Sequence, residues 1–271
     1  MIRNFLYEVL QEDIGRGDLY ARVASPVSSS AKIIAKSEGV LAGVEYIDVL
    51  ATMEPFEVQW NFCDGELFKK GDVLCTLKGD SLTLLKLERT ILNVILHASS
   101  IATLTRRYVN LIAPYGTKLL DTRKTRPKLR VFEKYATRIG GAINHRMGLD
   151  DALMLKDTHL KTIDNLVEFV RMARVNIPFT AKIEIEAEDK DMAIKAMEAG
   201  ADIVMCDNMK PDELKEIVII RNSRFPSILL EASGNISLET IEVYAQTGVD
   251  AISSGSLIHK ANWIDLSMKM D

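Results

Sequence analysis

The sequence predicts an α/β protein of two domains: an N-terminal open-faced α/β sandwich over residues 1–103 and a C-terminal irregular α/β barrel of about seven strands over residues 104–259. The length of 271 residues exceeds the usual size of a single domain. Short strand patterns separated by glycine turns dominate up to residue 77, which is typical of an open sheet. After residue 111 short strands alternate with helices, which indicates parallel βαβ units in sufficient number to close a barrel.

The first domain begins with apolar residues at helical spacing, which predict a helix over residues 2–12. Strand candidates follow at 31–36, 56–62 and 72–77, and a helix over 43–53 interrupts them. This half is therefore expected to form an open sheet with helices on one face.

Two further helical segments are predicted outside this sheet. The apolar periodicity of residues 82–111 predicts two consecutive helices that join the domains, with a break near Ser99 and Ser100. The last residues, from Trp263 to Asp271, also look helical. We therefore expect a C-terminal helix over 260–271 to fold back onto the first domain.

The sequence of the second half predicts seven strands that alternate with five helices. The usual barrel of this class has eight strands. The strand candidates are Lys118–Thr122, Ala142–Asn144, Ala152–Leu155, Thr180–Glu186, Ile203–Cys206, Ile228–Ala232 and Ala251–Ser253. The helix candidates are 128–138, 161–175, 189–199, 211–222 and 237–247.

Composition excludes several classes of protein. The net charge of −4 and the pI near 5.7 argue against bulk binding of nucleic acid, which needs a basic domain. No apolar run approaches the roughly 20 residues of a membrane span, and the N-terminus lacks the apolar core of a signal peptide. The three cysteines form no CxxC pair and are typical of reduced thiols. We expect a cytoplasmic protein that binds neither nucleic acid nor membrane.

A local cluster of cations stands out in this acidic protein. Arg123 and Lys124 come just after the apolar run that ends at Leu120, and Lys156 closes the apolar run 152–155. Cations at the ends of buried strands are costly to desolvate unless an anion meets them. The sequence therefore predicts a small, multiply charged anion as ligand. The cations between residues 123 and 146 are Arg123, Lys124, Arg126, Lys128, Arg130, Lys134, Arg138 and Arg146.

Functional side chains of a parallel barrel lie at the carboxyl ends of its strands. We expect the cations there to hold carboxylates or pyrophosphate, the glycine turns to hold a phosphate through backbone N–H groups, and the acids to hold ribose hydroxyls or Mg²⁺. The residues at these ends are Arg123, Lys124, His145, Arg146, Lys156, Glu186, Asp207, the turn Ser233-Gly234-Asn235 and the turn Ser254-Gly255-Ser256.

Other charged residues have simpler interpretations. Arg130, Lys134 and Arg138 recur on one helix face with Glu133 between them, which favours a solvated stripe. His159 either caps the helix that follows Lys156 or belongs to the site.

These motifs resemble the quinolinate phosphoribosyltransferase family, also called nicotinate-nucleotide pyrophosphorylase (carboxylating), over essentially the whole chain. DTRKT followed by NHRxGLxDAxxxKDxH is highly specific for this family. A relative associated with molybdenum transport shares DTRKT, but the NHR and KDTH pieces favour the quinolinate enzyme. The further matching segments are EDIGRGDLY, LERTILNVILHASSIATLT, KIEIEAE, MCDN, LEASGNIS and ISSGSLIH.

The resemblance implies an enzyme of de novo NAD biosynthesis. It would combine quinolinate with phosphoribosyl pyrophosphate, using Mg²⁺, to give nicotinate mononucleotide, pyrophosphate and CO₂. It also implies a homodimer with shared active sites, sometimes assembled into a hexamer, in which the first domain of one subunit covers the barrel of its partner.

The resemblance also implies a role for each strand-end residue. Lys124, Arg146, Lys156, Glu186 and Asp207 would be catalytic. Glu186 and Asp207 would also hold ribose hydroxyls or the metal, either directly or through water. The quinolinate and pyrophosphate pocket would be lined by Thr122, Arg123, Lys124, His145, Arg146 and Lys156. The 5′-phosphate would lie on Ser233, Gly234, Asn235, Ser254, Gly255 and Ser256.

Arg89 and three serines need separate treatment. Arg89 is either neutralised by Glu88 or, as the resemblance implies, reaches quinolinate in the neighbouring subunit. Ser100 stands where the family pattern has glycine, which puts local helix packing in doubt. Ser254 and Ser256 replace the usual Val and Ala around a glycine, which leaves the backbone phosphate site intact and offers extra hydroxyls.

Two rival functions stay open. A Schiff-base barrel of the aldolase type would use Lys156, but that chemistry needs a desolvated amine, and Lys156 lies beside Asp157 and other cations. A nucleic-acid or regulatory anion site would use the basic cluster, but only Phe132 and Tyr135 are interleaved with it.

Overall fold

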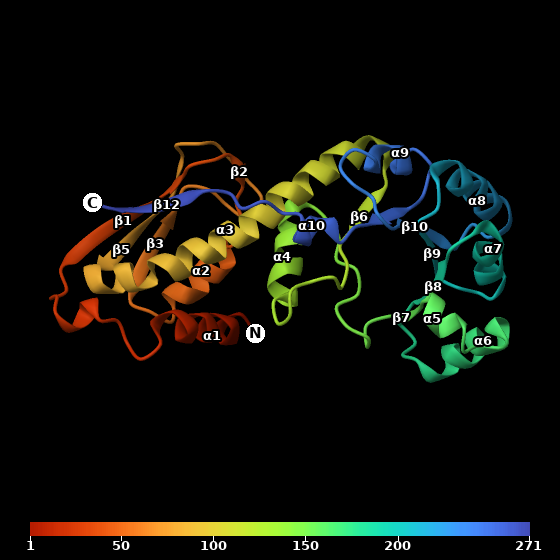
Figure 1. The fold of residues 1–271 in the computed structure, drawn as a ribbon, viewed down its shortest axis with the longest axis horizontal. Helices are drawn as coiled ribbons and strands as arrows, with labels where there is room; N and C mark the ends of the chain where they lie inside the picture. The colour runs from red at the N-terminus through yellow and green to blue at the C-terminus, as the bar shows by residue number, and fades with distance from the viewer. The chain divides into compact units, whose positions relative to one another are not determined.

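The structure, a computed structural model, describes residues 1–271 and divides them into two compact units (Figure 1). The first unit contains Met1–Arg106, Arg138–Gly141 and Ala261–Asp271. The second contains Arg107–Thr137 and Ala142–Lys260. An α/β fold is confirmed, with a parallel six-stranded sheet separate from an antiparallel four-stranded sheet.

The first unit is built on an antiparallel sheet in the order β12-β1-β5-β3. Its strands are β1 (Ser28–Ala35), β3 (Phe56–Trp60), β5 (Val73–Asp80) and β12 (Leu266–Met270), beside the short pair β2 (Gly39–Val40) and β4 (Leu67–Phe68). Its helices are α1 (Ile2–Ile14), η1 (Tyr20–Arg22), α2 (Val44–Ala51) and α3 (Ser81–Ile112), the last of which continues into the second unit. α2 packs against β3, and Figure 1 shows α3 alongside the sheet.

The side chains of β1 alternate between buried and partly exposed, which shows that one face of this sheet is covered. Ala31, Ile33 and Ala35 are fully buried, whereas the side chains between them are partly exposed. Ile47 on α2 and Leu84 on α3 are also fully buried. Full burial of an aliphatic side chain contributes about 1.5–3 kcal/mol, so the apolar face holds the helices against the strands.

The predicted break near Ser99 and Ser100 is wrong, because α3 runs without interruption. The Ser100 hydroxyl donates to the Leu96 carbonyl at 2.6 Å and accepts the Ile264 amide at 2.9 Å. The Ser99 hydroxyl donates to the Ala42 carbonyl at 3.1 Å. Both serines therefore satisfy their hydroxyls without leaving the helix, and Ser100 also ties the C-terminal segment to α3.

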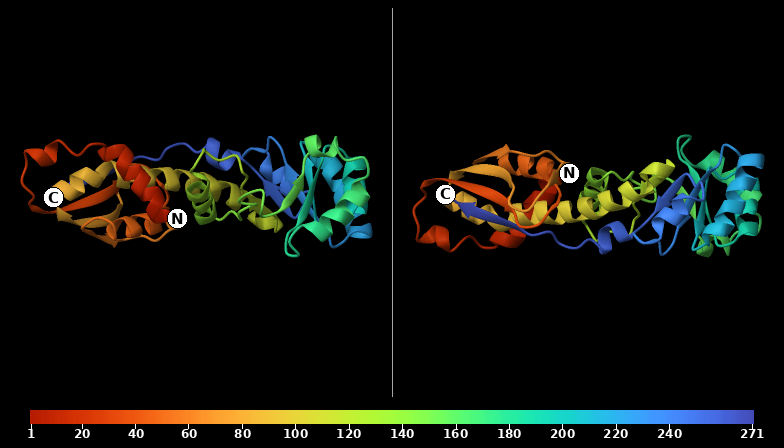
Figure 2. Two further views of the ribbon diagram at one scale, coloured as in Figure 1. Left: turned by 90° about the horizontal axis from the view of Figure 1, so that it is seen from below. Right: turned by 90° about the horizontal axis from the view of Figure 1, so that it is seen from above.

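The predicted C-terminal helix over 260–271 is wrong as well. The segment forms β12, an antiparallel edge strand in which Leu266 pairs with Ala35 and Met270 with Ala31 (Figure 2). Within the strand, Leu-Ser-Met-Lys-Met alternates apolar and polar residues between the two faces of the sheet.

The second unit contains a parallel sheet in the order β6-β11-β10-β9-β8-β7, with α7 packed against β8 and β9 (Figure 2). Its strands are β6 (Lys118–Leu120), β7 (Leu153–Leu155), β8 (Ile183–Ala187), β9 (Ile203–Asp207), β10 (Leu229–Ser233) and β11 (Ala251–Ser253). Its helices are η2 (Ala113–Tyr115), α4 (Arg130–Gly140), α5 (Asp157–Leu160), α6 (Leu166–Asn176), α7 (Lys190–Glu198), α8 (Pro211–Arg224), α9 (Ile241–Ala245) and α10 (Ser256–His259).

The strand expected over Ala142–Asn144 is reduced to a single bridge between Leu120 and Ile143, so the sheet has six strands. The next residues turn away because the Asn144 side chain and the His145 amide both donate to the Asp121 carboxylate, at 2.6 and 2.8 Å. Beyond Ile143, hydrogen bonds to the buried Asp121 carboxylate therefore take the place of hydrogen bonds between strands.

No helix in this structure has both the length and the apolar character that crossing a bilayer would require.

Candidate active site

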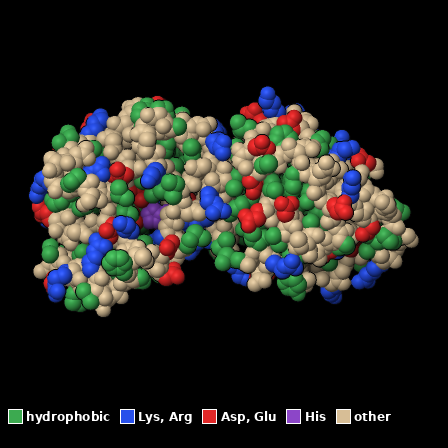
Figure 3. All heavy atoms as spheres, turned by 180° about the vertical axis from the view of Figure 1, so that it is seen from behind, with side chains coloured by type: hydrophobic (Ala, Val, Ile, Leu, Met, Phe, Trp, Pro, Cys, Tyr) green, Lys and Arg blue, Asp and Glu red, His purple; other side chains and the backbone are tan.

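Nine of the predicted site residues line one cavity of about 500 Å³ in the second unit. They come from the segments after β6 and β7, from the ends of β8, β9 and β10, and from the loop before β7. Figure 3 shows histidine atoms in a hollow bordered by Lys or Arg and by Asp or Glu side chains. The nine are Thr122, Arg123, Lys124, His145, Arg146, Lys156, Glu186, Asp207 and Ser233; Leu149, Met154, His159, Met205 and Ser253 complete the lining.

Two carboxylates and two ammonium groups form one wall of this cavity. Lys156 Nζ lies 2.5 Å from Glu186 Oε2, and Glu186 is almost fully buried. Burial, followed by the nearby Glu186 charge, raises the pKa of Asp207. Lys156 and Lys124 act in the opposite direction on the same carboxyl. The wall therefore holds paired acids that are neutralised by lysines at the cavity surface.

The guanidinium groups of Arg123 and Arg146 also line this cavity, and they lie close enough for their charges to interact. Burial lowers the pKa of Arg146, and the neighbouring Arg123 charge lowers it further. Arg146 donates to the Ala152 carbonyl at 2.9 Å, and the buried Nε of Arg123 has no hydrogen-bond partner within the chain. Two neighbouring positive charges repel each other, and the Arg123 Nε–H has no acceptor in the chain. An anion bound between the two guanidinium groups would relieve the repulsion and could accept this hydrogen bond.

A buried cluster of one histidine and two acids lies behind the cavity, and the sequence did not predict its acids. His145 Nε2 is 3.1 Å from a Glu184 carboxylate oxygen and 3.3 Å from Glu231. Both glutamates are 1% exposed. Glu184 precedes Glu186 by two residues on β8, so the two acids share a face. This spacing of two could have identified Glu184 from the sequence. A search restricted to the ends of strands misses an acid that lies within a strand.

Burial and the two acids act in opposite directions on the pKa of His145. Burial lowers the pKa of His145, but hydrogen bonds and charge from Glu184 and Glu231 outweigh it and raise that pKa to about 10. Burial also raises the pKa of Glu184. The Arg146 amide donates to His145 Nδ1 at 2.7 Å, an arrangement in which Nδ1 carries no proton and the ring proton lies on Nε2, toward the two carboxylates. A histidine that ligates a metal donates through its other ring nitrogen, so this arrangement favours a proton cluster over a metal site.

The predicted solvated stripe on α4 is wrong at Lys134. This lysine is 1% exposed and its ammonium lies 2.6 Å from Asp121. Arg130 donates to the Met147 carbonyl at 2.9 Å, and only Arg138 is exposed as expected. Helical spacing identifies a common face, but it does not say whether that face meets solvent or buried acids.

The turn after β10 is fixed against the end of β9. The Asn208 amide donates to the Ser233 carbonyl at 2.9 Å, and the Asn235 side chain donates to Asn208 Oδ1 at 3.1 Å. Gly234 has a φ of +92°, and a Cβ there would overlap the Asn208 side chain. Asn208 also donates to Asp207 Oδ2 at 2.7 Å. The turn and the cavity acid are therefore one hydrogen-bonded unit.

Gly234→Ala is expected to weaken the binding of an anionic substrate at this turn and to destabilise the protein by about 2 kcal/mol or more, since backbone strain and overlap act together. Gly200→Ala is the matched control, because Gly200 has a φ of +87° with no atom within 4 Å of the added Cβ. Urea unfolding and the substrate KM give the comparison. Equal losses of stability in the two variants would show that the Asn208 contact is unimportant.

The remaining predicted residues lie beside the cavity or in the other unit. Gly255 packs against Lys124 and Thr122, at 3.0 and 3.4 Å from its Cβ position. Gly234 and Asn235 continue the turn that begins at Ser233. Arg89 lies on α3 in the first unit and pairs with Glu88 at 3.0 Å, so its reach into a partner's site stays a prediction.

The hydroxyls of the last turn serve the fold. Ser254 Oγ donates to the Ile236 carbonyl at 3.3 Å and accepts the Ser256 amide at 3.2 Å. The Ser256 side chain is buried. His159 accepts the Lys156 amide at 3.1 Å, so it caps α5 and also lines the cavity.

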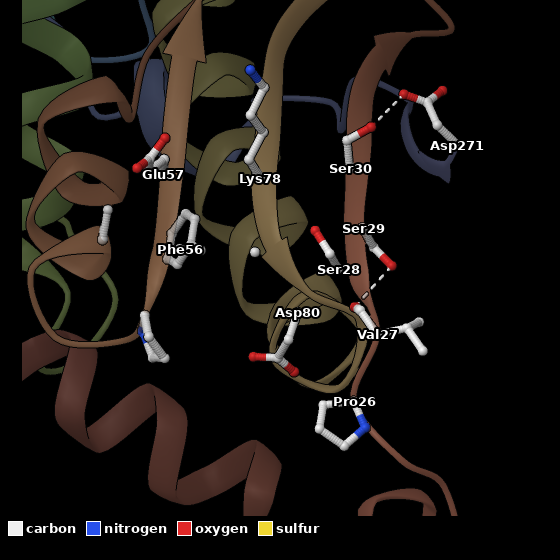
Figure 4. A pocket seen from close by; sticks show the side chains of 13 residues that line it. Pro26, Val27, Ser28, Ser29, Ser30, Phe56, Glu57, Lys78, Asp80 and Asp271 are labelled. Carbon is white, nitrogen blue, oxygen red and sulfur yellow. Dashed lines mark hydrogen bonds between the residues drawn. The ribbon is translucent and has the colours of Figure 1, made fainter.

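A larger cavity of about 980 Å³ in the first unit is a poorer candidate (Figure 4). Lys78 is its one cationic lining residue, against the three acids Glu57, Asp80 and Asp271. Asp271 already accepts from the Ser30 hydroxyl at 2.7 Å. This charge balance does not suit a multiply charged anion, whereas the second-unit cavity does.

Known proteins resemble the chain over its whole length. The family description "Quinolinate phosphoribosyl transferase, N-terminal domain" matches residues 18–99, and the corresponding "C-terminal domain" matches residues 101–269. A protein of Synechocystis named probable nicotinate-nucleotide pyrophosphorylase [carboxylating] is 40% identical, with 100% of this chain and 92% of that protein covered.

Other relatives agree. A protein of the same name from Bacillus subtilis is 38% identical over 98% of this chain and 92% of its own length. The solved nicotinate-nucleotide pyrophosphorylase of Francisella tularensis has a TM-score of 0.94 at 35% identity, covering 100% of this chain and 96% of that one. Both the sequence and the fold therefore place the chain in the quinolinate phosphoribosyltransferase family.

Proposed function

We propose that the protein transfers a phosphoribosyl group from phosphoribosyl pyrophosphate to quinolinate and releases CO₂, giving nicotinate mononucleotide and pyrophosphate for NAD biosynthesis. One observation carries this proposal. Arg123, Lys124, Arg146 and Lys156 meet Glu186 and Asp207 in one cavity of about 500 Å³. Two carboxylates, a 5′-phosphate and a pyrophosphate supply the negative charge that these cations match.

Each type of cation suits one part of the two substrates. Planar guanidinium forks bind carboxylates in a bidentate manner, so Arg123 and Arg146 would hold the diacid. Lysines act as point charges on phosphate oxygens, so Lys156 would face the pyrophosphate, whereas Lys124 would act more on quinolinate than on phosphoribosyl pyrophosphate. One terminal nitrogen of Arg146 donates to the Ala152 carbonyl at 2.9 Å, which sets the orientation of the guanidinium before substrate binds.

The protein then contributes orientation and fixed charge. The pyridine nitrogen attacks C1 of the ribose while pyrophosphate leaves, and the transition state resembles an oxocarbenium ion. Glu186 and Asp207 would stabilise this positive charge. The new bond leaves the ring nitrogen positive, and that charge stabilises the electron pair that remains on C2 when the C2 carboxylate departs as CO₂; C2 then takes up a proton from solvent. A covalent nucleophile is not required.

The same two acids fit a magnesium ion. The Glu186 charge already helps to raise the pKa of Asp207, so a divalent cation near both carboxylates would relieve their repulsion. Carboxylate oxygens are the ligands that Mg²⁺ prefers. When bound with phosphoribosyl pyrophosphate, the ion would neutralise the leaving pyrophosphate.

We also propose a homodimer with shared sites, sometimes a hexamer, that acts in the cytoplasm. Mixing Arg89→Ala protein with Lys156→Ala protein is then expected to restore activity, because one hybrid site regains both residues. The measurement is the rate of product formation after verified subunit exchange, and each variant alone serves as the control. No recovery would place both residues in the site of a single subunit.

The proposed reaction is tested by incubating the purified protein with quinolinate, phosphoribosyl pyrophosphate and Mg²⁺. Nicotinate mononucleotide is the expected product, and its absence would overturn the proposal. The Schiff-base alternative is disfavoured because Lys156 Nζ already pairs with Glu186 Oε2 at 2.5 Å. Borohydride trapping of a carbonyl substrate on Lys156 would revive it.

A further inference from the structure

Lys134 is a buried lysine whose ammonium group contacts only protein atoms. Nζ donates to Asp121 Oδ1 at 2.6 Å, to the His145 carbonyl at 2.7 Å and to the Arg146 carbonyl at 3.1 Å. Its side chain is 1% exposed. These three acceptors use all the protons of the ammonium group, so Lys134 has no donor left for a ligand.

Asp121 is the centre of the same network, and it is fully buried. Besides Lys134, its carboxylate accepts the His145 amide at 2.8 Å, the Asn144 side chain at 2.6 Å and the Thr137 hydroxyl at 2.9 Å. A buried carboxylate with four donors is well compensated. The network therefore joins the end of β6, the body of α4 and the backbone from 144 to 146.

This arrangement decides which groups of the 144–146 backbone face the substrate cavity. Two carbonyl oxygens would repel an anion if they faced it. Lys134 holds the carbonyls of His145 and Arg146 on its own side, while the side chains of both residues line the cavity. The next carbonyl, that of Met147, is held by Arg130 at 2.9 Å.

We propose that Asp121 and Lys134 are positioning residues that set the affinity of the cavity for the pyridine diacid. The proposal rests on the proposed function, because it assigns Arg146 to quinolinate. Lys156, Glu186, Asp207 and Ser233 belong to other strand ends and receive no hydrogen bond from this pair. The pair therefore acts on the diacid half of the cavity and leaves the phosphoribosyl half in place.

The decisive variant is the double change Asp121→Asn with Lys134→Met. Lys134→Met alone leaves a buried, unpaired carboxylate and is liable to unfold, whereas the double variant buries no charge. It still lacks the donor that holds the two carbonyls. We expect the KM for quinolinate to rise at least about tenfold and the KM for phosphoribosyl pyrophosphate to stay within about twofold, since misplacing a binding group by a fraction of an ångström has such effects.

The controls separate positioning from general damage. Arg138→Met removes an exposed cation from the same helix and is expected to leave both KM values unchanged. A loss of folded protein lowers kcat and leaves both KM values as they were, so that result, or an equal rise in both, would overturn the proposal.

If the double variant does not fold, Thr137→Val decides, because it removes one hydrogen bond to Asp121 without changing charge. A selective rise of about twofold or more in the quinolinate KM is then expected. An unchanged quinolinate KM would overturn the proposal. Failure of the wild-type protein to make nicotinate mononucleotide would instead overturn the proposed function.

Discussion

Arg146→Ala is expected to lower kcat/KM for quinolinate at least about a hundredfold, as the loss of one preorganised charge contact does. The guanidinium lies beside Arg123 and is held at the cavity by the Ala152 carbonyl at 2.9 Å. Alanine removes both the charge and the fork that would bind a carboxylate. Arg146→Lys is expected to recover only part of the loss, because an ammonium group keeps the charge without the bidentate geometry. Initial rates with quinolinate as the varied substrate give the comparison.

A matched control for this loss lies on α6. Arg171 is exposed and pairs with Glu168 at 2.6 Å, so Arg171→Ala removes an arginine from the same unit at a place away from the cavity. Its rate is expected to equal that of the wild-type protein. An Arg146→Ala enzyme within about threefold of wild type would show that this guanidinium does not bind substrate.

Lys156→Ala is expected to lower kcat about a hundredfold with both substrates saturating. Lys156 Nζ lies 2.5 Å from Glu186 and also acts on Asp207. Without its charge the two carboxylates repel the phosphate oxygens that must approach them. Steady-state rates at saturating quinolinate and phosphoribosyl pyrophosphate provide the measurement.

Lys161→Ala provides the control for this second variant. Lys161 is exposed five positions along the chain and pairs with Asp157 at 3.4 Å, so its removal changes the net charge of the same segment without reaching the cavity. Near-normal turnover in Lys156→Ala would rule out a role for this ammonium in the chemical step.

The strand-end residues could be predicted because a parallel sheet brings the carboxyl ends of its strands to one edge. Arg123, Lys156, Glu186 and Asp207 are far apart in the sequence, yet they line one cavity. Arg123, Lys156 and Asp207 each come after a short apolar run, and Glu186 lies at the end of a predicted strand, so local signals are enough to place all four. The same physical rule explains why the fold class was predictable from alternating strands and helices.

The burial of Lys134 and of two strand acids could not be predicted from the sequence, because it depends on which residues from other segments pack against them. Lys134 has the spacing of an exposed stripe, but the acid that buries it is Asp121, on another element. Glu184 and Glu231 lie within strands, where an acid is tolerated only because His145 lies between them. In each case the partner, and not the local pattern, decides the outcome.

The C-terminal segment illustrates the same limit. Five alternating residues from Leu266 to Met270 are too short for periodicity to separate a strand from a helix end. Pairing with β1 settles the matter, because an edge strand gains its hydrogen bonds only from the neighbour.

The most direct test of the central claim is a crystal structure of the protein with bound quinolinate. The two carboxylates are expected in the second-unit cavity, against the guanidinium groups of Arg123 and Arg146, with the ring nitrogen toward Glu186 and Asp207. Quinolinate bound in the first-unit cavity beside Lys78, or outside both cavities, would contradict the assignment of the cationic cavity as the active site.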